Sequence, residues 1–193
     1  GRTDAGVHAL RYCANFKTDC RIPTDRIPLA VNARLPGDIA VVAAVDAPED
    51  FNAISSCIKK EYIYKIRANE VRDTFLCDRI FELGKSIDTL NTEKMKIAAK
   101  HFIGTHDFSA FMASGSSVTD TVRCVKNAEV IRQGSNVIFK VSADGFLYNM
   151  VRIMVGTLTD VSTGKIKENE INEIIESKDR GRAGMTAPPD GLY

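Results

Sequence analysis

The chain has 193 residues, of which 44% are hydrophobic and 26% are charged. This composition is typical of a soluble globular protein with one sizeable core or two small ones. No run approaches the roughly 18 consecutive apolar residues of a membrane span, so none is predicted. The chain starts without Met and has no basic segment followed by an apolar one, so no secretory signal is expected.

The cysteines are odd in number and include no CxxC pair. Such thiols are usually reduced in the cytosol, so we expect a cytoplasmic protein without a structural zinc site. The five are Cys13, Cys20, Cys57, Cys77 and Cys124.

The net charge of +1 does not by itself indicate a nucleic-acid-binding protein. Phosphate binding needs a local basic patch rather than a basic whole chain. The first 34 residues carry six Lys or Arg side chains against three Asp, whereas acids gather in residues 168–176. This asymmetry permits an RNA-binding face near the N-terminus.

In chain order, residues 10–17 alternate as a strand does, and Thr24 is a plausible N-cap for a short helix with Pro28 in its first turn. The turn at 36–38 then leads into a predicted strand at 39–45. A strand with a clear period of two is predicted at 57–67. This period places Tyr62 on the same strand face as Lys60 and Tyr64.

Apolar residues at helical spacing predict a helix over 92–102, with Gly104 as its C′ residue. Residues 122–132 and 136–144 read as a hairpin. A buried helix is predicted over 146–159, with Arg152 off its apolar stripe, and an amphipathic helix over 168–177. This order of elements predicts an α+β fold with an antiparallel sheet.

The first nine residues contain the strongest candidate for a catalytic side chain. Gly1 and Gly6 allow sharp bends, and Arg2 can favour the charged form of Asp4. An exposed carboxylate on a tight loop is suited to act as a nucleophile or a base. The same residues also fit a turn with a solvated salt bridge.

The sequence GRTDAGVHA at 1–9 resembles the catalytic loop of TruA-type tRNA pseudouridine synthases. Further matches to that family follow in the family's order along essentially the whole chain. They are LPGDI at 35–39, FNA at 51–53, KEYIY at 60–64, GTHDF at 104–108, DTVR at 120–123, FLYNMVR at 146–152 and TAPPDGLY at 186–193.

The resemblance implies a pseudouridine synthase fold, in which two ferredoxin-like halves share one antiparallel sheet with helices packed on one face. It assigns residues 1–50 to the remainder of the N-terminal half, which carries the catalytic loop, and 51–193 to the C-terminal half. On that template we expect the chain to be a fragment that lacks the N-terminal segment and the last strand. A homodimer is expected for the full-length protein.

The resemblance also implies an isomerase that needs no cofactor and converts uridine to pseudouridine in the anticodon stem-loop of tRNA. Asp4 matches the family's catalytic aspartate, and Tyr62 matches its active-site tyrosine, which stacks on the flipped base or acts as a base. We expect stacking, because a phenol with a reference pKa near 10 is a reluctant base. Arg152 matches the arginine that pairs with the carboxylate, so a separation of about 4 Å from Asp4 is expected.

Four further residues are expected to bind the RNA substrate: Arg2, His8, Lys59 and Lys60. The chain departs from the family at Ile54 and Ser55, where an arginine and an aromatic residue are usual, and at residues 10–12. These departures affect local RNA contacts more than the core chemistry.

One alternative to an active pseudouridine synthase is a catalytically silent RNA-binding fragment. A weaker one is a metal-dependent hydrolase that uses Asp4, His8 and Asp19.

Overall fold

The computed structural model describes residues 3–193. Within these residues the chain divides into two compact units. The smaller unit is Tyr12–Ser56, and the larger unit combines the N-terminal residues up to Arg11 with Cys57–Tyr193. The larger unit therefore contains both the loop around Asp4 and every predicted element after residue 56.

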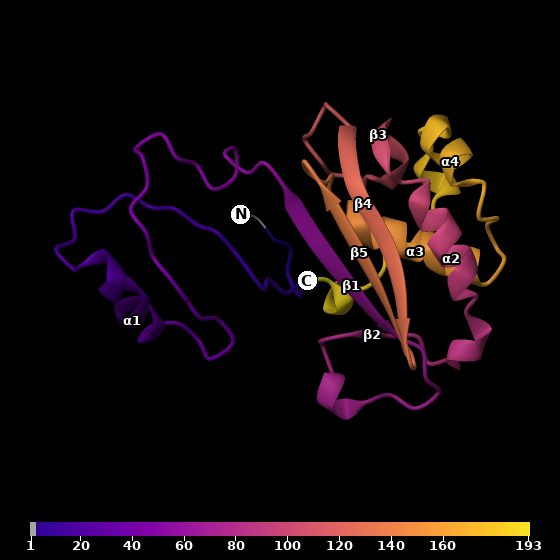
Figure 1. Cartoon of the computed structure of the whole chain (residues 1–193), viewed down its shortest axis with the longest axis horizontal. Coiled ribbons are helices and arrows are strands. Elements are labelled where there is room, and N and C mark those ends of the chain that lie inside the picture. The colour runs from indigo at the N-terminus through magenta and orange to yellow at the C-terminus, as the bar shows by residue number, and fades with distance from the viewer. Residues whose placement is uncertain (1–2) are drawn as a thin grey trace. The chain divides into compact units, whose positions relative to one another are not determined.

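The larger unit is built on one five-stranded sheet with the strand order β2-β1-β5-β4-β3 (Figure 1). Its strands are β1 (Lys60–Arg67), β2 (Phe81–Glu82), β3 (Gly104–Asp107), β4 (Val122–Gln133) and β5 (Asn136–Ala143). The predicted hairpin is confirmed, because β4 and β5 pair along most of their length around a turn in which Gly134 has a φ of 57°. Only glycine adopts such a φ without a steric penalty.

All neighbouring strands pair antiparallel except β1 and β2, which pair in parallel at the edge of the sheet. The predicted antiparallel sheet is thus confirmed for four strands, and its edge makes the sheet mixed. A two-residue edge strand leaves no alternating pattern long enough to be recognised from the sequence.

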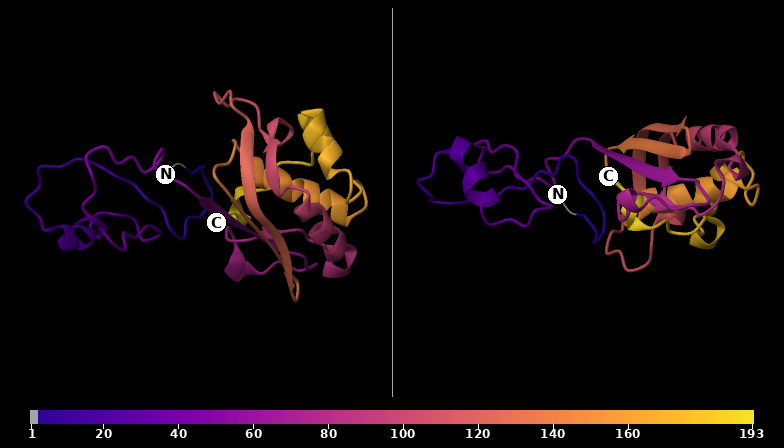
Figure 2. Two further views of the ribbon diagram at one scale, coloured as in Figure 1. Left: turned by 45° about the horizontal axis from the view of Figure 1, so that its top comes forward. Right: turned by 90° about the horizontal axis from the view of Figure 1, so that it is seen from below.

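Helices α2 (Thr92–Lys100) and α3 (Met150–Ser162) lie on one face of this sheet (Figures 1 and 2). Alternation along the strands turns Tyr64 and Ile66 of β1 and Phe139 of β5 toward these helices, where all three side chains are fully buried. Burying such side chains contributes roughly 1.5–3 kcal/mol each to folding. The fourth helix, α4 (Ile171–Ser177), packs near β3.

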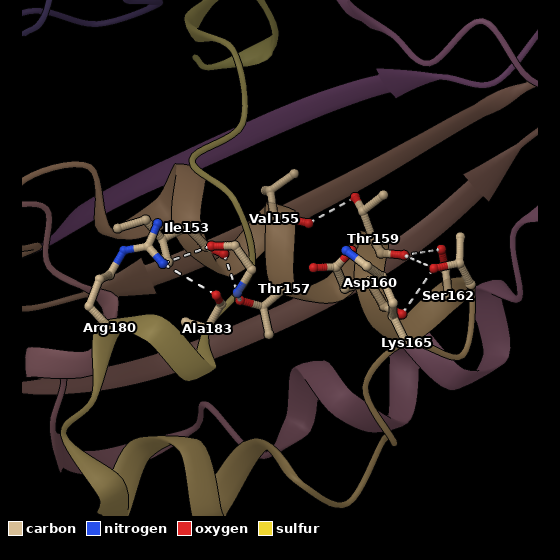
Figure 3. Close-up of polar contacts among 11 residues, drawn as sticks. Ile153, Val155, Thr157, Thr159, Asp160, Ser162, Lys165, Arg180 and Ala183 are labelled. Carbon is tan, nitrogen blue, oxygen red and sulfur yellow. Dashed lines mark hydrogen bonds and ion pairs between the residues drawn. The ribbon is translucent and has the colours of Figure 1, made fainter.

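Helix α3 makes an unusually close contact with the chain segment that follows α4. A Cβ atom added to Gly156 would lie 1.8 Å from the carbonyl oxygen of Met185, so only glycine fits there. The buried hydroxyl of Thr157 donates to Ile153 O and accepts a hydrogen bond from the Gly184 amide (Figure 3). Helix α3 and residues 183–187 are thereby held in one register.

Two predicted helices begin later than expected. Helix α3 starts at Met150 because Asn149 has left-handed backbone angles, with φ 58° and ψ 10°, which cannot continue a helix. Helix α4 starts at Ile171, three residues after the predicted start. Gly104 lies at the start of β3 instead of serving as the C′ residue of α2.

The smaller unit contains one 3₁₀ turn, η1 (Thr24–Arg26), followed by helix α1 (Ile27–Asn32) with Pro28 in its first turn. The predicted helix is confirmed, but the Thr24 hydroxyl donates to Asp46 and does not cap it. The strands predicted at 10–17 and 39–45 are wrong, because neither segment pairs with a strand among the described residues. A strand needs a partner for its backbone hydrogen bonds, and an alternating sequence does not provide one.

No helix among residues 3–193 has the length and apolar character needed to cross a membrane.

Candidate active site

The candidate active site is organised around the C-terminal segment, residues 187–193. Its first residue, Ala187, is bound twice by Arg152: the Ala187 amide donates to Arg152 O at 3.1 Å, and Arg152 Nε donates to Ala187 O at 2.6 Å. The next carbonyl, of Pro188, accepts a hydrogen bond of 2.6 Å from the Tyr64 hydroxyl. Tyr193 exchanges two backbone hydrogen bonds of 2.8 Å with Ile63 of β1. The segment thus joins α3 to β1.

The loop that carries Asp4 contacts the same segment. Its turn at Ala5 and Gly6 gives Gly6 a φ of 79°, and a Cβ atom added there would lie 3.0 Å from Pro189 Cγ. The His8 amide donates to Leu192 O at 2.9 Å. Asp4 itself is exposed at the tip of this loop. Of the two glycines predicted to allow sharp bends in this loop, Gly6 has such a conformation, and Gly1 lies outside the described residues.

The His8 ring is fully engaged within the protein. It stacks on the Tyr193 ring at a centroid distance of 4.5 Å, and its Nε2 lies 2.8 Å from Asp78 O. The Tyr193 hydroxyl donates to Arg79 O, and Lys65 Nζ lies 3.9 Å from the centroid of the same ring. His8 therefore anchors the end of the loop that carries Asp4 to the C-terminal segment.

Tyr62 lies on β1, half-buried, with its ring edge-on to Phe146 at a centroid distance of 5.0 Å. Burial raises the pKa of its phenol, and the negative charge of Asp4 and then that of Cys57 raise the pKa further. The loop of Asp4 and the strand of Tyr62 are also joined by hydrogen bonds, because Leu192 O accepts from the His8 amide and Tyr193 pairs with Ile63. They are far apart in the sequence, so the tertiary structure alone brings them together.

Arg152 lies on the first turn of α3 and is half-buried. Besides its bond to Ala187, its Nη1 donates to Asn149 Oδ1 at 2.9 Å. Among residues 3–193, no hydrogen bond or ion pair is formed by its Nη2. The expected Asp4–Arg152 ion pair within about 4 Å is likewise absent from the described residues, where Arg152 binds Ala187 and Asn149 instead.

The other sequence-predicted RNA-binding residues are placed as follows. Lys59 is exposed just before β1, 3.5 Å from Glu61, and Lys60 is half-buried on the same strand face as Tyr62. Arg2 lies outside the described residues. The roles of all these side chains, and those of Asp4, Tyr62 and Arg152, stay predictions at this point.

A metal site is not indicated by the described part of the chain, where no three His, Cys, Asp or Glu side chains are grouped to hold an ion. One ring nitrogen of His8, Nε2, lies 2.8 Å from Asp78 O. That alternative therefore gains no support from the structure.

Several residues of the site carried no predicted role in the sequence. Phe146 packs on Tyr62, Asn149 holds Arg152, and Pro189 supports the turn at Gly6. All three lie in the motifs FLYNMVR and TAPPDGLY, so motif membership was the available signal. Which atoms they contact could not be read from that signal.

Comparison with known proteins places this chain in a family. The family described as tRNA pseudouridine synthase matches residues 98–193. The chain is 48% identical to tRNA pseudouridine synthase A of Thermoanaerobacter sp. strain X514 over 192 residues, which cover 100% of this chain and 78% of the relative. It is 46% identical to the protein of the same name from Caldicellulosiruptor bescii, again over 78% of that relative. The relative from Halalkalibacterium halodurans is 42% identical, with 72% of its length covered.

Identity of this level along the whole chain shows that the protein belongs to the tRNA pseudouridine synthase family. The α+β sheet with helices on one face is accordingly a pseudouridine synthase fold.

Proposed function

We propose that the protein isomerises uridine to pseudouridine in the anticodon stem-loop of tRNA, with Asp4 as the reacting carboxylate. Membership of the family supports the reaction and the tRNA substrate. The structural observation that supports this site is that residues 192 and 193 bind both the loop of Asp4, through the His8 amide, and β1 next to Tyr62, through Ile63.

The reaction breaks the bond between ribose C1′ and uracil N1, turns the base and rejoins it through C5, which loses its proton. No electrons are exchanged, so side chains alone can supply the chemistry. Asp4 is exposed on its loop, where a base flipped out of the RNA stack could reach it. The carboxylate would add to the base or to the sugar carbon.

Two residues would assist Asp4. The half-buried ring of Tyr62 offers a face for stacking on the flipped uracil, and stacking needs no ionisation. Arg152 keeps Nη2 available for a carboxylate or a phosphate oxygen.

Lys59 and Lys60 precede Tyr62 on the chain and would contact phosphates. Arg2 and His8 are proposed RNA contacts as well, although the His8 ring would then bind RNA from its position on Tyr193.

The test uses tRNA transcripts with uridine tritiated at C5, because each turnover then releases tritium. Asp4→Asn and Asp4→Ala should abolish release while the Kd for tRNA stays within severalfold, since a reacting group contributes mainly to the transition state. Asp88→Asn is the matched control, because Asp88 is exposed and pairs with Arg132 near the β4–β5 turn. It should turn over like the wild type.

Turnover of Asp4→Asn at the wild-type rate would disprove the assignment of Asp4. A wild-type protein that binds tRNA but releases no tritium would instead support a catalytically silent RNA-binding protein.

We further propose that the protein acts in the cytoplasm and that the full-length protein is a homodimer. The cytoplasm is supported by the proposed tRNA substrate and by the free thiols of Cys20, Cys57, Cys77 and Cys124. The dimer is supported by exposed apolar side chains of the smaller unit, among them Val42 at 93% and Val45 at 82%. Contiguous exposed apolar surface commonly marks an interface.

A further inference from the structure

The entry into helix α3 combines an unfavourable backbone conformation with a side-chain contact to the site. Asn149 has a φ of 58°, a region that L-residues other than Asn and Asp rarely occupy. Its side chain caps none of the free amides of α3. The Oδ1 atom instead accepts a hydrogen bond of 2.9 Å from Arg152 Nη1. The carboxamide is therefore directed at the guanidinium and not at the helix.

Arg152 is held on two sides by different elements. Asn149 binds Nη1 from the start of α3, and Ala187 O binds Nε from the C-terminal segment. A planar guanidinium fixed at two nitrogens has a fixed orientation for its third. In the described part of the chain that third nitrogen, Nη2, is without a partner.

The same C-terminal segment also contacts the loop of Asp4. Pro189, two residues after Ala187, packs on Gly6, two residues after Asp4. The segment that orients the guanidinium therefore also supports the turn that carries the carboxylate.

We propose that Asn149 is a positioning residue, which orients Arg152 so that Nη2 can bind the Asp4 carboxylate or the substrate; this rests on the proposed function. The side chain of Asn149, immediately before the helix, contacts Arg152 on its first turn. An amide suits this position better than a carboxylate, because a neutral acceptor holds the guanidinium without neutralising its charge.

The experiment compares two substitutions that both tolerate a positive φ. Asn149→Gly keeps the backbone conformation and removes the acceptor. Asn149→Asp keeps the shape and the contact but adds a negative charge that competes with Asp4 for Arg152. We expect kcat for pseudouridine formation to fall about tenfold in the first variant and at least as much in the second, with KM changed less than about threefold.

Lys178→Gly is the matched control, because Lys178 also has a positive φ at a helix end and its side chain also makes one polar contact, to Asp107. It should keep the wild-type kcat. A purely structural role for Asn149 predicts that Asn149→Asp keeps both stability and kcat. Wild-type kcat in either Asn149 variant, or an equal loss in Lys178→Gly, would overturn the proposal.

A second readout does not depend on turnover. In the wild type, an Nη1–H of Arg152 donates to Asn149 Oδ1, so the NMR signal of this proton should exchange slowly with water. Asn149→Gly should accelerate that exchange, and unchanged exchange would overturn the proposal. A wild-type protein without turnover would refute the proposed function, whereas unchanged exchange would refute only the positioning role.

Discussion

At the residue scale, the environment of Tyr62 bears on its role. Burial and the nearby charge of Asp4 both disfavour the phenolate, so the pKa lies above the ordinary value of 10.0. A general base must be deprotonated near the working pH, and this shift moves Tyr62 further from that condition. The edge-on contact with Phe146 fixes the ring, as a stacking surface requires.

We therefore expect Tyr62→Phe to keep pseudouridine formation within severalfold of the wild type between pH 6 and 9. Tyr62→Ala should lose about 1–3 kcal/mol of transition-state stabilisation, because it removes the stacking face. Tritium release at several pH values measures both effects. A loss of activity in Tyr62→Phe as severe as that in Tyr62→Ala would assign an essential role to the hydroxyl instead.

At the element scale, Asp107 joins three parts of the larger unit. Its carboxylate, at the end of β3, lies 2.8 Å from Lys178 Nζ, which follows α4. It also accepts hydrogen bonds from the Thr121 hydroxyl at 2.6 Å and from the Ser109 amide at 3.1 Å. The contact with Lys178, and then that with Thr121, lowers the pKa of Asp107 well below its ordinary value of 3.8.

A lowered pKa in the folded state means that the ionised carboxylate stabilises folding above the unfolded-state pKa. This contribution is lost as the pH falls through the folded-state pKa. We expect Asp107→Asn to reduce the free energy of unfolding by about 1–2 kcal/mol at pH 7, because Lys178 is exposed and its pairing is screened. The difference from the wild type should shrink as the pH falls below about 4.

Urea unfolding of both proteins between pH 7 and pH 3 measures this difference. The control is Asp88→Asn, in which the exposed pair with Arg132 is lost and a change below about 0.5 kcal/mol is expected. An Asp107→Asn difference that stays constant over this pH range would mean that the charge of Asp107 does not stabilise the fold.

At the scale of the whole molecule, the two units differ in how far they bury their own side chains. No residue of 12–56 is buried among the described residues, whereas the larger unit contains the entire hydrophobic core. A unit without a core of its own gains stability by covering its apolar side chains with a partner surface. This difference underlies the proposed dimer.

Light scattering coupled to size-exclusion chromatography should therefore give, for the full-length protein, a mass about twice that of one full-length chain. Val42→Asp combined with Val45→Asp should shift the protein toward the monomer, because a buried unpaired charge disfavours association. Lys85→Asp, in the loop after β2 of the larger unit, is the control for added charge. A monomer at every concentration tested would refute the dimer.

The sequence alone determined the parts of the fold that carry a local signal. Short stretches of sequence suffice to predict the alternation of β1, the turn at Gly134 between β4 and β5, and the apolar stripes of α2 and α3. The motifs that follow the order of the pseudouridine synthase family likewise identified Asp4, Tyr62 and Arg152 as candidate site residues.

The tertiary structure alone decided what depends on contacts between distant segments. Alternation at 10–17 predicted a strand that does not form, because the pattern contains no information about a hydrogen-bonding partner. The contact of Gly6 with Pro189, the absence of an Asp4–Arg152 ion pair among residues 3–193, and the hydrogen bond from Arg152 to Ala187 follow from how the N-terminal loop, α3 and residues 187–193 pack together. Such contacts join residues far apart in the chain, and they leave no periodicity in the sequence from which they could be predicted.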